Sequence, residues 1–176
     1  MGLKSHEQEA GEMSTLTPIV RAAGEGDKQS FMGGGHHTWK LLAEDTGGAF
    51  FMFEDVMGQG KCTPLHQHPE AAETVYVLEG EIVVNVDGQE TRVGAGGVTF
   101  TPNGVPHAFL VVSDSARILT IQTPGIGQAF YRGASDPAVD DTADTVDIAR
   151  LQASAQANPR GIQLLGPPPF DAVAAG

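Results

Sequence analysis

The sequence predicts an all-β protein built as an antiparallel sandwich or barrel. From Trp39 onward, short apolar segments rich in β-branched and aromatic residues alternate with turns of Gly, Pro, Asp and Asn. These segments read HTWKLLA, AFFMFEDVM, ETVYVLEG, EIVVNVDG, QETRVGAGG, VTFTP, HAFLVVS and ARILTIQT. Such regular spacing is typical of antiparallel all-β folds rather than of alternating strands and helices. The Asp87-Gly88 pair between two of the segments predicts a tight hairpin.

The 176 residues suit a single domain, since one core of this size can fold without disulfides. Residues 1–17 are polar and unpatterned, and we expect a disordered tail there, with Met1 and Met13 both open as translation starts. Residues 18–134 should form the barrel. Residues 135–176 should add a helix and a Pro-rich tail packed on the outside of the barrel.

The charge of the chain argues against two classes of partner. Lys and Arg total 10 against 22 Asp and Glu, a net charge of −12 that repels phosphate backbones and anionic lipid surfaces. No apolar run is long enough to span a membrane, the N-terminal residues lack the apolar core of a secretory signal, and Cys62 is the single cysteine. We therefore expect a cytoplasmic protein that binds neither nucleic acid nor membrane.

An acidic stretch precedes the expected C-terminal helix. Its aspartates are Asp136, Asp140, Asp141, Asp144 and Asp147. Acidic residues at a helix start complement the helix dipole, so we interpret them as a solvated helix start rather than as a cation site.

A group of histidines and one glutamate carries the clearest chemical signal. His66 and His68 point to the same face of a strand because side chains alternate, and a bend over residues 69–72 would let Glu73 join them. His107, which follows a Pro- and Gly-rich turn, is the candidate fourth ligand. Imidazole nitrogens and a carboxylate oxygen form a ligand set for a divalent transition metal.

The spacing of these residues resembles that of the cupin family. The segment GKCTPLHQHPEAAETVYVLEG matches the first cupin motif from Gly60 to Gly80, and GGVTFTPNGVPH matches the second from Gly96 to His107. The 15 residues between the motifs are typical of microbial single-domain cupins. One departure is Val111, where the second motif usually closes with Asn.

The resemblance implies a double-stranded β-helix, or jelly-roll, barrel with one metal ion bound by His66, His68, Glu73 and His107. The ligands do not select among iron, nickel, cobalt, manganese, copper and zinc. With neutral imidazoles and one carboxylate, a bound divalent ion would keep a net positive charge and would favour anionic oxygen donors.

The layout of the whole chain is most similar to bacterial single-domain cupins that resemble quercetin 2,3-dioxygenase. This similarity implies an enzyme that cleaves an enol or flavonol-type substrate with dioxygen, with Glu73 also acting as the catalytic base. Two alternatives stay open from the sequence. One is a non-oxidative cupin enzyme such as an isomerase, decarboxylase or cyclase, and the other is a non-catalytic cupin that binds a metal or ligand.

Strand parity also predicts an apolar substrate pocket. Its expected wall residues are Phe51, Phe53, Val75, Val77, Phe109 and Val111. Such a lining suits a flat, largely hydrophobic small molecule.

The remaining predictions concern three single residues and one edge of the sheet. His36 and His37 follow three glycines and are interpreted as surface residues of a loop. The thiol of Cys62 would line the pocket if its strand runs on past Pro64, but we interpret Cys62 as a buried, small apolar side chain. The N-terminal strands around HTWKLLA are expected to offer a free sheet edge, which predicts a symmetric homodimer.

Overall fold

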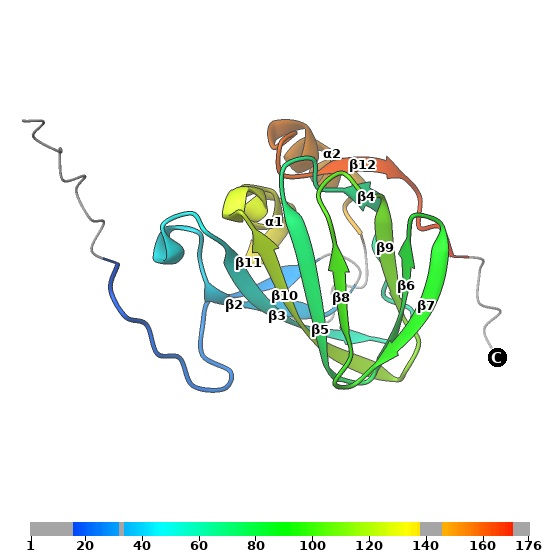
Figure 1. The fold of residues 1–176 in the computed structure, drawn as a ribbon, viewed down its shortest axis with the longest axis horizontal. Helices are drawn as coiled ribbons and strands as arrows, with labels where there is room; N and C mark the ends of the chain where they lie inside the picture. The colour runs from blue at the N-terminus through cyan, green and yellow to red at the C-terminus, as the bar shows by residue number, and fades with distance from the viewer. Residues whose placement is uncertain (1–15, 32–33, 138–145, 171–176) are drawn as a thin grey trace, which may run out of the picture.

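Two antiparallel sheets face each other, and two α-helices pack beside them in the part of the chain that the structure describes (Figure 1). A computed structural model describes residues 16–31, 34–137 and 146–170. Residues 1–15 of the expected tail lie outside these ranges. The predicted jelly-roll barrel with a short C-terminal helix is confirmed.

The larger sheet has seven strands in the order β11-β1-β2-β3-β10-β5-β8. Its strands are β1 (Lys28–Phe31), β2 (His36–Leu41), β3 (Phe51–Gly58), β5 (Ala72–Glu79), β8 (Val98–Thr101), β10 (Ser115–Thr123) and β11 (Ser135–Pro137). The long strands β3, β10 and β5 form its centre. Because every second residue of β10 is buried and the others are half-buried or exposed, one face of the sheet points into the core.

The smaller sheet has five strands in the order β12-β4-β9-β6-β7. Its strands are β4 (Leu65–Gln67), β6 (Glu81–Val86), β7 (Gln89–Gly94), β9 (His107–Val111) and β12 (Gln163–Gly166). The predicted hairpin joins β6 to β7: Asp87 and Gly88 both have positive φ angles, of 52° and 78°, as a two-residue turn of this kind requires.

Two clusters of buried side chains fill the interior. One gathers around Trp39, Phe51 and Phe53 under helix α1 (Gln128–Ala134). The other lies between the two sheets and includes Val77 and Ile118. The phenylalanines of β3 therefore face the helices.

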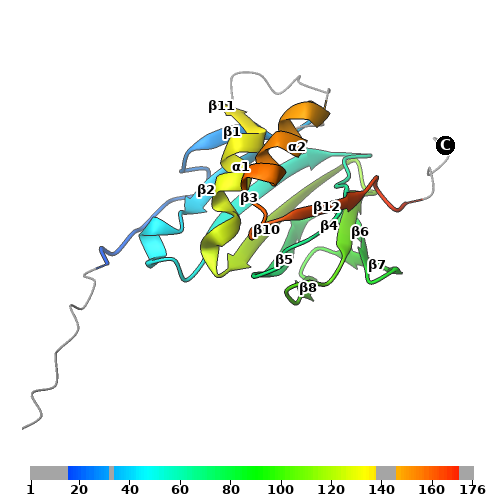
Figure 2. The same ribbon diagram turned by 90° about the horizontal axis from the view of Figure 1, so that it is seen from above.

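Helix α1 was not predicted from the sequence. It follows a short 3-10 turn (Gly125–Gly127) and lies beside α2 (Ile148–Ala157) (Figure 2). Asp147 caps α2 by accepting a hydrogen bond from the backbone NH of Arg150 at 2.9 Å, as expected for an aspartate at a helix start. Asp136 lies in β11 instead, and Asp140, Asp141 and Asp144 lie outside the described residues.

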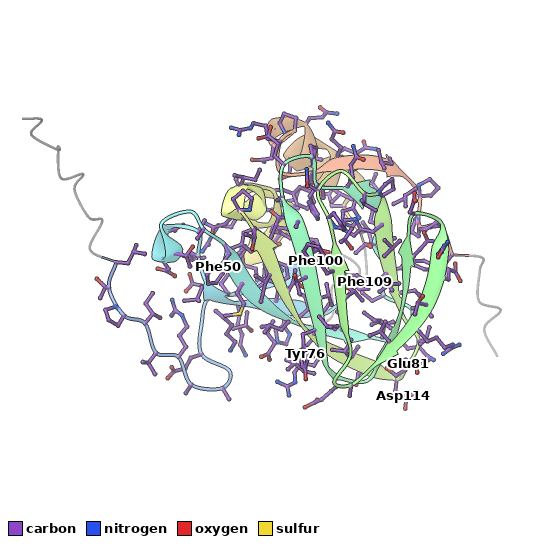
Figure 3. All side chains as sticks on the ribbon, in the orientation of Figure 1. Phe50, Tyr76, Glu81, Phe100, Phe109 and Asp114 are labelled. Carbon is purple, nitrogen blue, oxygen red and sulfur yellow. The ribbon has the colours of Figure 1, made fainter. Side chains whose placement is uncertain are left out.

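The prediction that the N-terminal strands offer a free edge is wrong. Both sides of β2 are paired, one with β1 and the other with β3, and β11 continues the sheet beyond β1. The other end of this sheet is β8, where Phe100, labelled in Figure 3, is 63% exposed and pairs with Thr74 of β5. The homodimer itself stays a prediction.

The C-terminal segment contributes a strand to the barrel. β12 pairs with β4 at the edge of the smaller sheet, and Ile162 just before it is buried. Pro168 follows the strand, where no backbone donor is needed. Within the described residues, neither helix has the length and apolar character needed to cross a membrane.

Candidate metal centre

The four predicted ligands come from both sheets and meet between them. His66 lies in β4 directly opposite His107 of β9, in the smaller sheet. His68 follows the end of β4, and Glu73 lies near the start of β5 in the larger sheet. The bend over residues 69–72 therefore carries the chain from one sheet to the other, and the ligand set spans the gap.

The ligand atoms are close enough to share one ion. One atom from each of His66, His68, Glu73 and His107 lies within 4.8 Å of all the others, and all four residues are buried. The imidazole centroids of His66 and His107 are 4.3 Å apart, and those of His66 and His68 are 5.1 Å apart. The structure thus brings together the four residues that the sequence singled out.

Backbone carbonyl groups hold each imidazole by its Nδ1 atom. His66 Nδ1 lies 2.8 Å from the Pro64 oxygen, and His107 Nδ1 lies 2.9 Å from the Val105 oxygen. His68 Nδ1 lies 2.7 Å from the oxygen of Gly161, at the C-terminal side of α2. Because a carbonyl only accepts, each Nδ1 carries the proton and each Nε2 presents a lone pair toward the shared centre. This is the tautomer that a metal-binding histidine needs.

A cation is needed where these lone pairs meet the carboxylate. His68 Nε2 lies 3.1 Å from Glu73 Oε2, and His107 Nε2 lies 3.3 Å from Glu73 Oε1. His107 Nε2 is buried without any hydrogen-bond partner among the described residues. Acceptors facing acceptors at these distances repel unless a positive charge lies between them. A divalent transition metal ion therefore fits this ligand set, while the set does not select which one.

The pKa values of Glu73, His66 and His107 shift in different directions. Burial would lower the pKa of His107, but its contacts with Glu73 outweigh burial and raise that pKa. Burial alone would raise the pKa of Glu73, but His107 and His68 outweigh it and hold that pKa well below its usual range. Burial, reinforced by His107 and His68, lowers the pKa of His66 to about 3. His66 is thus a neutral imidazole across the physiological range, the form that binds metal.

An apolar cavity of about 160 Å³ opens beside the ligands. His66 and Glu73 form part of its wall, and aromatic and aliphatic side chains form most of the rest. The apolar members include Phe31, Phe53, Phe109, Phe130, Ile162 and Leu164. Tyr131 of α1 also lines the cavity, and its hydroxyl donates a hydrogen bond to Glu73 Oε2 at 3.2 Å.

The six residues expected to form the pocket separate into two groups. Phe53 and Phe109 line the cavity, and Phe109 is marked in Figure 3. The other four, Phe51, Val75, Val77 and Val111, are buried in the two core clusters and do not line it. Parity alone placed all six on inward faces, but it does not say which inward side chains pack and which border empty space.

Three ionisable residues of the cavity wall, Asp55, Lys61 and Tyr131, were not predicted from the sequence. Asp55 shares the parity of Phe51 and Phe53, so an acidic residue at an inward position was a readable signal. Lys61 lies inside the first motif and Tyr131 on the unanticipated helix, and neither has a local pattern that marks it.

Two single-residue interpretations need correction. His37 is not a surface residue: its side chain is fully buried in β2, 5.3 Å from the ring of Trp39 and 5.1 Å from that of Phe53. His36 is half-buried in the same strand. Cys62 is half-buried rather than buried and lines the cavity, where burial raises the pKa of its thiol.

Comparisons with known proteins show which proteins this chain is similar to in sequence and fold. Residues 52–122 match the model of the cupin domain family. Over 120 residues the chain is 28% identical to quercetin 2,3-dioxygenase of Bacillus subtilis, a match that covers 68% of this chain and 35% of that protein. An uncharacterised protein of Streptomyces coelicolor is 36% identical over 59 residues, which are 33% of this chain and 56% of that one. The chain thus spans about a third to a half of the length of these curated relatives.

Solved structures share the fold. KdgF from Halomonas sp. aligns with a TM-score of 0.56 and 18% identity, over 61% of this chain and 94% of that one. A predicted oxalate decarboxylase from Thermotoga maritima aligns with a TM-score of 0.54 and 24% identity, over 61% and 99% of the two chains. The segment that matches the cupin domain family, residues 52–122, contains both motifs that bring the four ligands together, so this part of the chain is similar to cupin domains in sequence as well as in fold.

Proposed function

We propose that this protein is a metal-dependent dioxygenase that cleaves an enol or flavonol-type substrate with dioxygen. The observation that carries the proposal is a ligand set of three oriented imidazoles and one carboxylate at the wall of an apolar, aromatic cavity. The 28% identity to quercetin 2,3-dioxygenase over 68% of the chain supports the same chemistry. A metal ion held by the four residues would supply Lewis acidity and a redox centre for dioxygen.

The cavity favours a flat aromatic substrate. Its volume of about 160 Å³ is close to that of an engineered protein cavity that encloses benzene. One ring can therefore lie among Phe53, Phe109 and Phe130, and a larger flavonol would extend through the open side of the cavity. Apolar walls also exclude water from a reactive enolate.

Within this site, Glu73 is the residue that accepts the substrate proton. Its carboxylate contacts His68 and His107, and its Oε2 atom accepts the Tyr131 hydrogen bond, so the group is held in one orientation. A substrate hydroxyl whose pKa is lowered at the metal centre can transfer its proton to this carboxylate. Tyr131 is a positioning residue for Glu73.

The test is oxygen consumption with flavonol substrates, after metal content has been measured. Protein that contains a redox-active metal should consume dioxygen with quercetin and incorporate both atoms of isotopically labelled dioxygen into the product. The Glu73→Gln variant should bind part of the metal and lose turnover by about a hundredfold or more. Glu79→Gln, at the exposed end of the same strand, is the matched control and should keep full activity.

Three results would contradict the proposal. Full turnover in Glu73→Gln would remove the base role of that residue. Conversion of an enol substrate without oxygen consumption would replace the dioxygenase by a non-oxidative cupin enzyme, and the absence of any conversion by metal-loaded protein would favour a binding protein.

A further inference from the structure

Two charged residues interrupt the apolar wall of the cavity away from the metal ligands. Asp55 of β3 and Lys61, which follows that strand, both line the cavity, and each is only 6% exposed. Around them the wall is mainly aromatic and aliphatic. Neither residue takes part in holding the metal ligands.

The hydrogen-bonding capacity of both groups is largely unused. The Lys61 ammonium carries three N–H donors, and among the described residues it donates one hydrogen bond, to the Phe31 carbonyl at 2.9 Å. Its Nζ also lies 5.1 Å from the centroid of the Phe31 ring. Asp55 accepts no hydrogen bond from the described residues, and its Oδ1 lies 3.9 Å from His37 Nδ1, which is itself buried without a partner.

Keeping such groups in an apolar cavity is unfavourable for folding. Burial raises the pKa of Asp55 to about 7, with Lys61 opposing the rise, and burial lowers the pKa of Lys61 to about 8 against the pull of Asp55. Well-packed apolar residues of similar size would often be as stable or more stable at such positions. A stabilising role therefore does not account for the pair, and a ligand that completes its hydrogen bonds does.

The backbones of the pair and of the metal ligands are separated within the same sheet, although the Glu73 carboxylate is close enough to add to the rise in the pKa of Asp55. Asp55 pairs with Ile118 of β10, and Glu73 pairs with Gln122 of the same strand. Asp55 and Glu73 are thus two strands apart across the sheet and four residues apart along it. These spacings place their backbones on the order of 15 Å from each other. The cavity-lining residue Thr120 lies on β10 between the two positions, and the side chains reach inward from both ends.

We propose that Asp55 and Lys61 form a second recognition site in the cavity, which binds a hydroxyl group at the end of the substrate remote from the metal ligands. Lys61 Nζ donates a hydrogen bond to the hydroxyl oxygen, and the Asp55 carboxylate accepts the hydroxyl proton. The substrate class is therefore a hydroxylated aromatic compound with one metal-directed end and one hydroxyl end. This inference rests on the proposed function only in taking the cavity as the substrate site.

The experiment compares two catechols that differ in one group. 4-(Hydroxymethyl)catechol and 4-ethylcatechol share the metal-directed hydroxyls and end in OH and CH₃ respectively. Calorimetry under nitrogen, with zinc-loaded protein, gives the dissociation constant of each without turnover because zinc is not redox-active. The wild-type protein should prefer the alcohol by about ten- to a hundredfold, as hydrogen bonds to charged groups predict.

Two variants test whether Asp55 and Lys61 cause the preference for the alcohol. In Lys61→Met the preference should fall to about threefold or less, and Asp55→Asn should reduce it by about tenfold. The affinity of 4-ethylcatechol should be the same in wild type and variants, which shows that the cavity is intact. Lys28→Met, at an exposed position of β1, is the matched control and should keep the full preference.

Equal affinities for the two catechols in the wild type, or no binding of either, overturns the inference, and so does a full preference in Lys61→Met. If Lys61→Met does not fold, Asp55→Asn decides between the outcomes. Because the readout is a ratio of affinities, it does not depend on dioxygenase activity. A hydroxyl preference without oxygen consumption would retain the recognition site and reject the dioxygenase.

Discussion

His68 Nδ1 lies 2.7 Å from the carbonyl oxygen of Gly161, so a ligand of the metal centre is oriented by backbone 93 residues further along the chain. Gly161 can take this place because it has no side chain: a Cβ atom there would lie 2.8 Å from the Gly127 Cα and 3.1 Å from the Ile126 oxygen. The turn after α2, the 3-10 turn before α1 and the ligand histidine are therefore in direct contact.

Gly161→Ala should weaken metal binding. The added methyl group displaces the Gly161 carbonyl or the facing backbone, and loss of a hydrogen bond that orients a ligand histidine typically reduces metal affinity about ten- to a hundredfold. Competition with a chelator measures the change. Gly166→Ala, where a Cβ meets nothing within 4 Å, is the control and should bind metal normally. Equal affinities in the two variants would show that the Gly161 contact does not orient His68.

Protein purified without chelators should contain close to one divalent transition metal ion per chain, and His66→Ala should lose it. The imidazole of His66 supplies one of four converging ligand atoms, and the remaining three leave an incomplete site. Elemental analysis of both proteins, with His36→Ala as a control, checks this. The absence of metal from the wild type even after reconstitution would mean that the cluster is not a metal centre.

Tyr131→Phe should separate the positioning of Glu73 from the packing of α1. The variant keeps the ring in the aromatic cluster and removes only the hydroxyl that donates to Glu73 Oε2 at 3.2 Å. A hydrogen bond to a charged group contributes about 1.5–3 kcal/mol, so metal-loaded protein should unfold more easily by roughly this amount. Chemical denaturation measures it, and Tyr76→Phe, on the exposed face of β5, should show no change. An unaltered free energy of unfolding in Tyr131→Phe would indicate that the contact contributes nothing.

Asp55→Asn should change how stability depends on pH. The pKa of Asp55 rises from 3.8 to about 7 in the folded protein, so between these values the folded state binds one more proton at this site than the unfolded state. In that interval the Asp55 contribution to the free energy of unfolding falls by about 1.4 kcal/mol per pH unit as pH rises. Asn removes this contribution, so the variant should gain stability relative to the wild type from about pH 4 to 7.

The free energy of unfolding of the variant must be compared with that of the wild type at each pH, because the ionisation of His37 changes stability with pH in the opposite direction. Burial, with Lys61 and Arg132 adding to it, lowers the pKa of His37 to about 3, which makes the wild type more stable as pH rises toward 6.5. Denaturation curves of both proteins at equal metal content give the contribution of Asp55 to the free energy of unfolding at each pH. A difference that stays flat from pH 4 to 7 would show that Asp55 is ionised in the folded protein, as an unburied carboxyl would be.

The four ligands could be predicted from the sequence because each lies within a short motif of fixed residue spacing. Alternation along a strand puts His66 and His68 on one face, and the motif spacing supplies Glu73 and His107. The Asp87-Gly88 hairpin was readable for the same reason, since positive φ angles restrict the residues that a two-residue turn accepts.

The missed residues depend on contacts between distant segments. Val75 and Phe109 both have inward parity, yet only Phe109 borders the cavity. The edge of the sheet was predicted at the N-terminal strands because no local sequence pattern indicates that β11 pairs with β1 there. His37 was assigned to the surface because the three preceding glycines indicate a loop, whereas packing against Trp39 and Phe53 buries it.

The sequence by itself determined the fold class, the cupin motifs and the four residues that converge on one centre. Tertiary structure alone decided that Gly161 orients His68, that Tyr131 bonds Glu73, and that Asp55 and Lys61 share a cavity with them. The physical reason is that a two-residue period and a turn preference act within a few bonds of the backbone. Cavities and hydrogen bonds between segments exist only after both sheets and α1 have packed together.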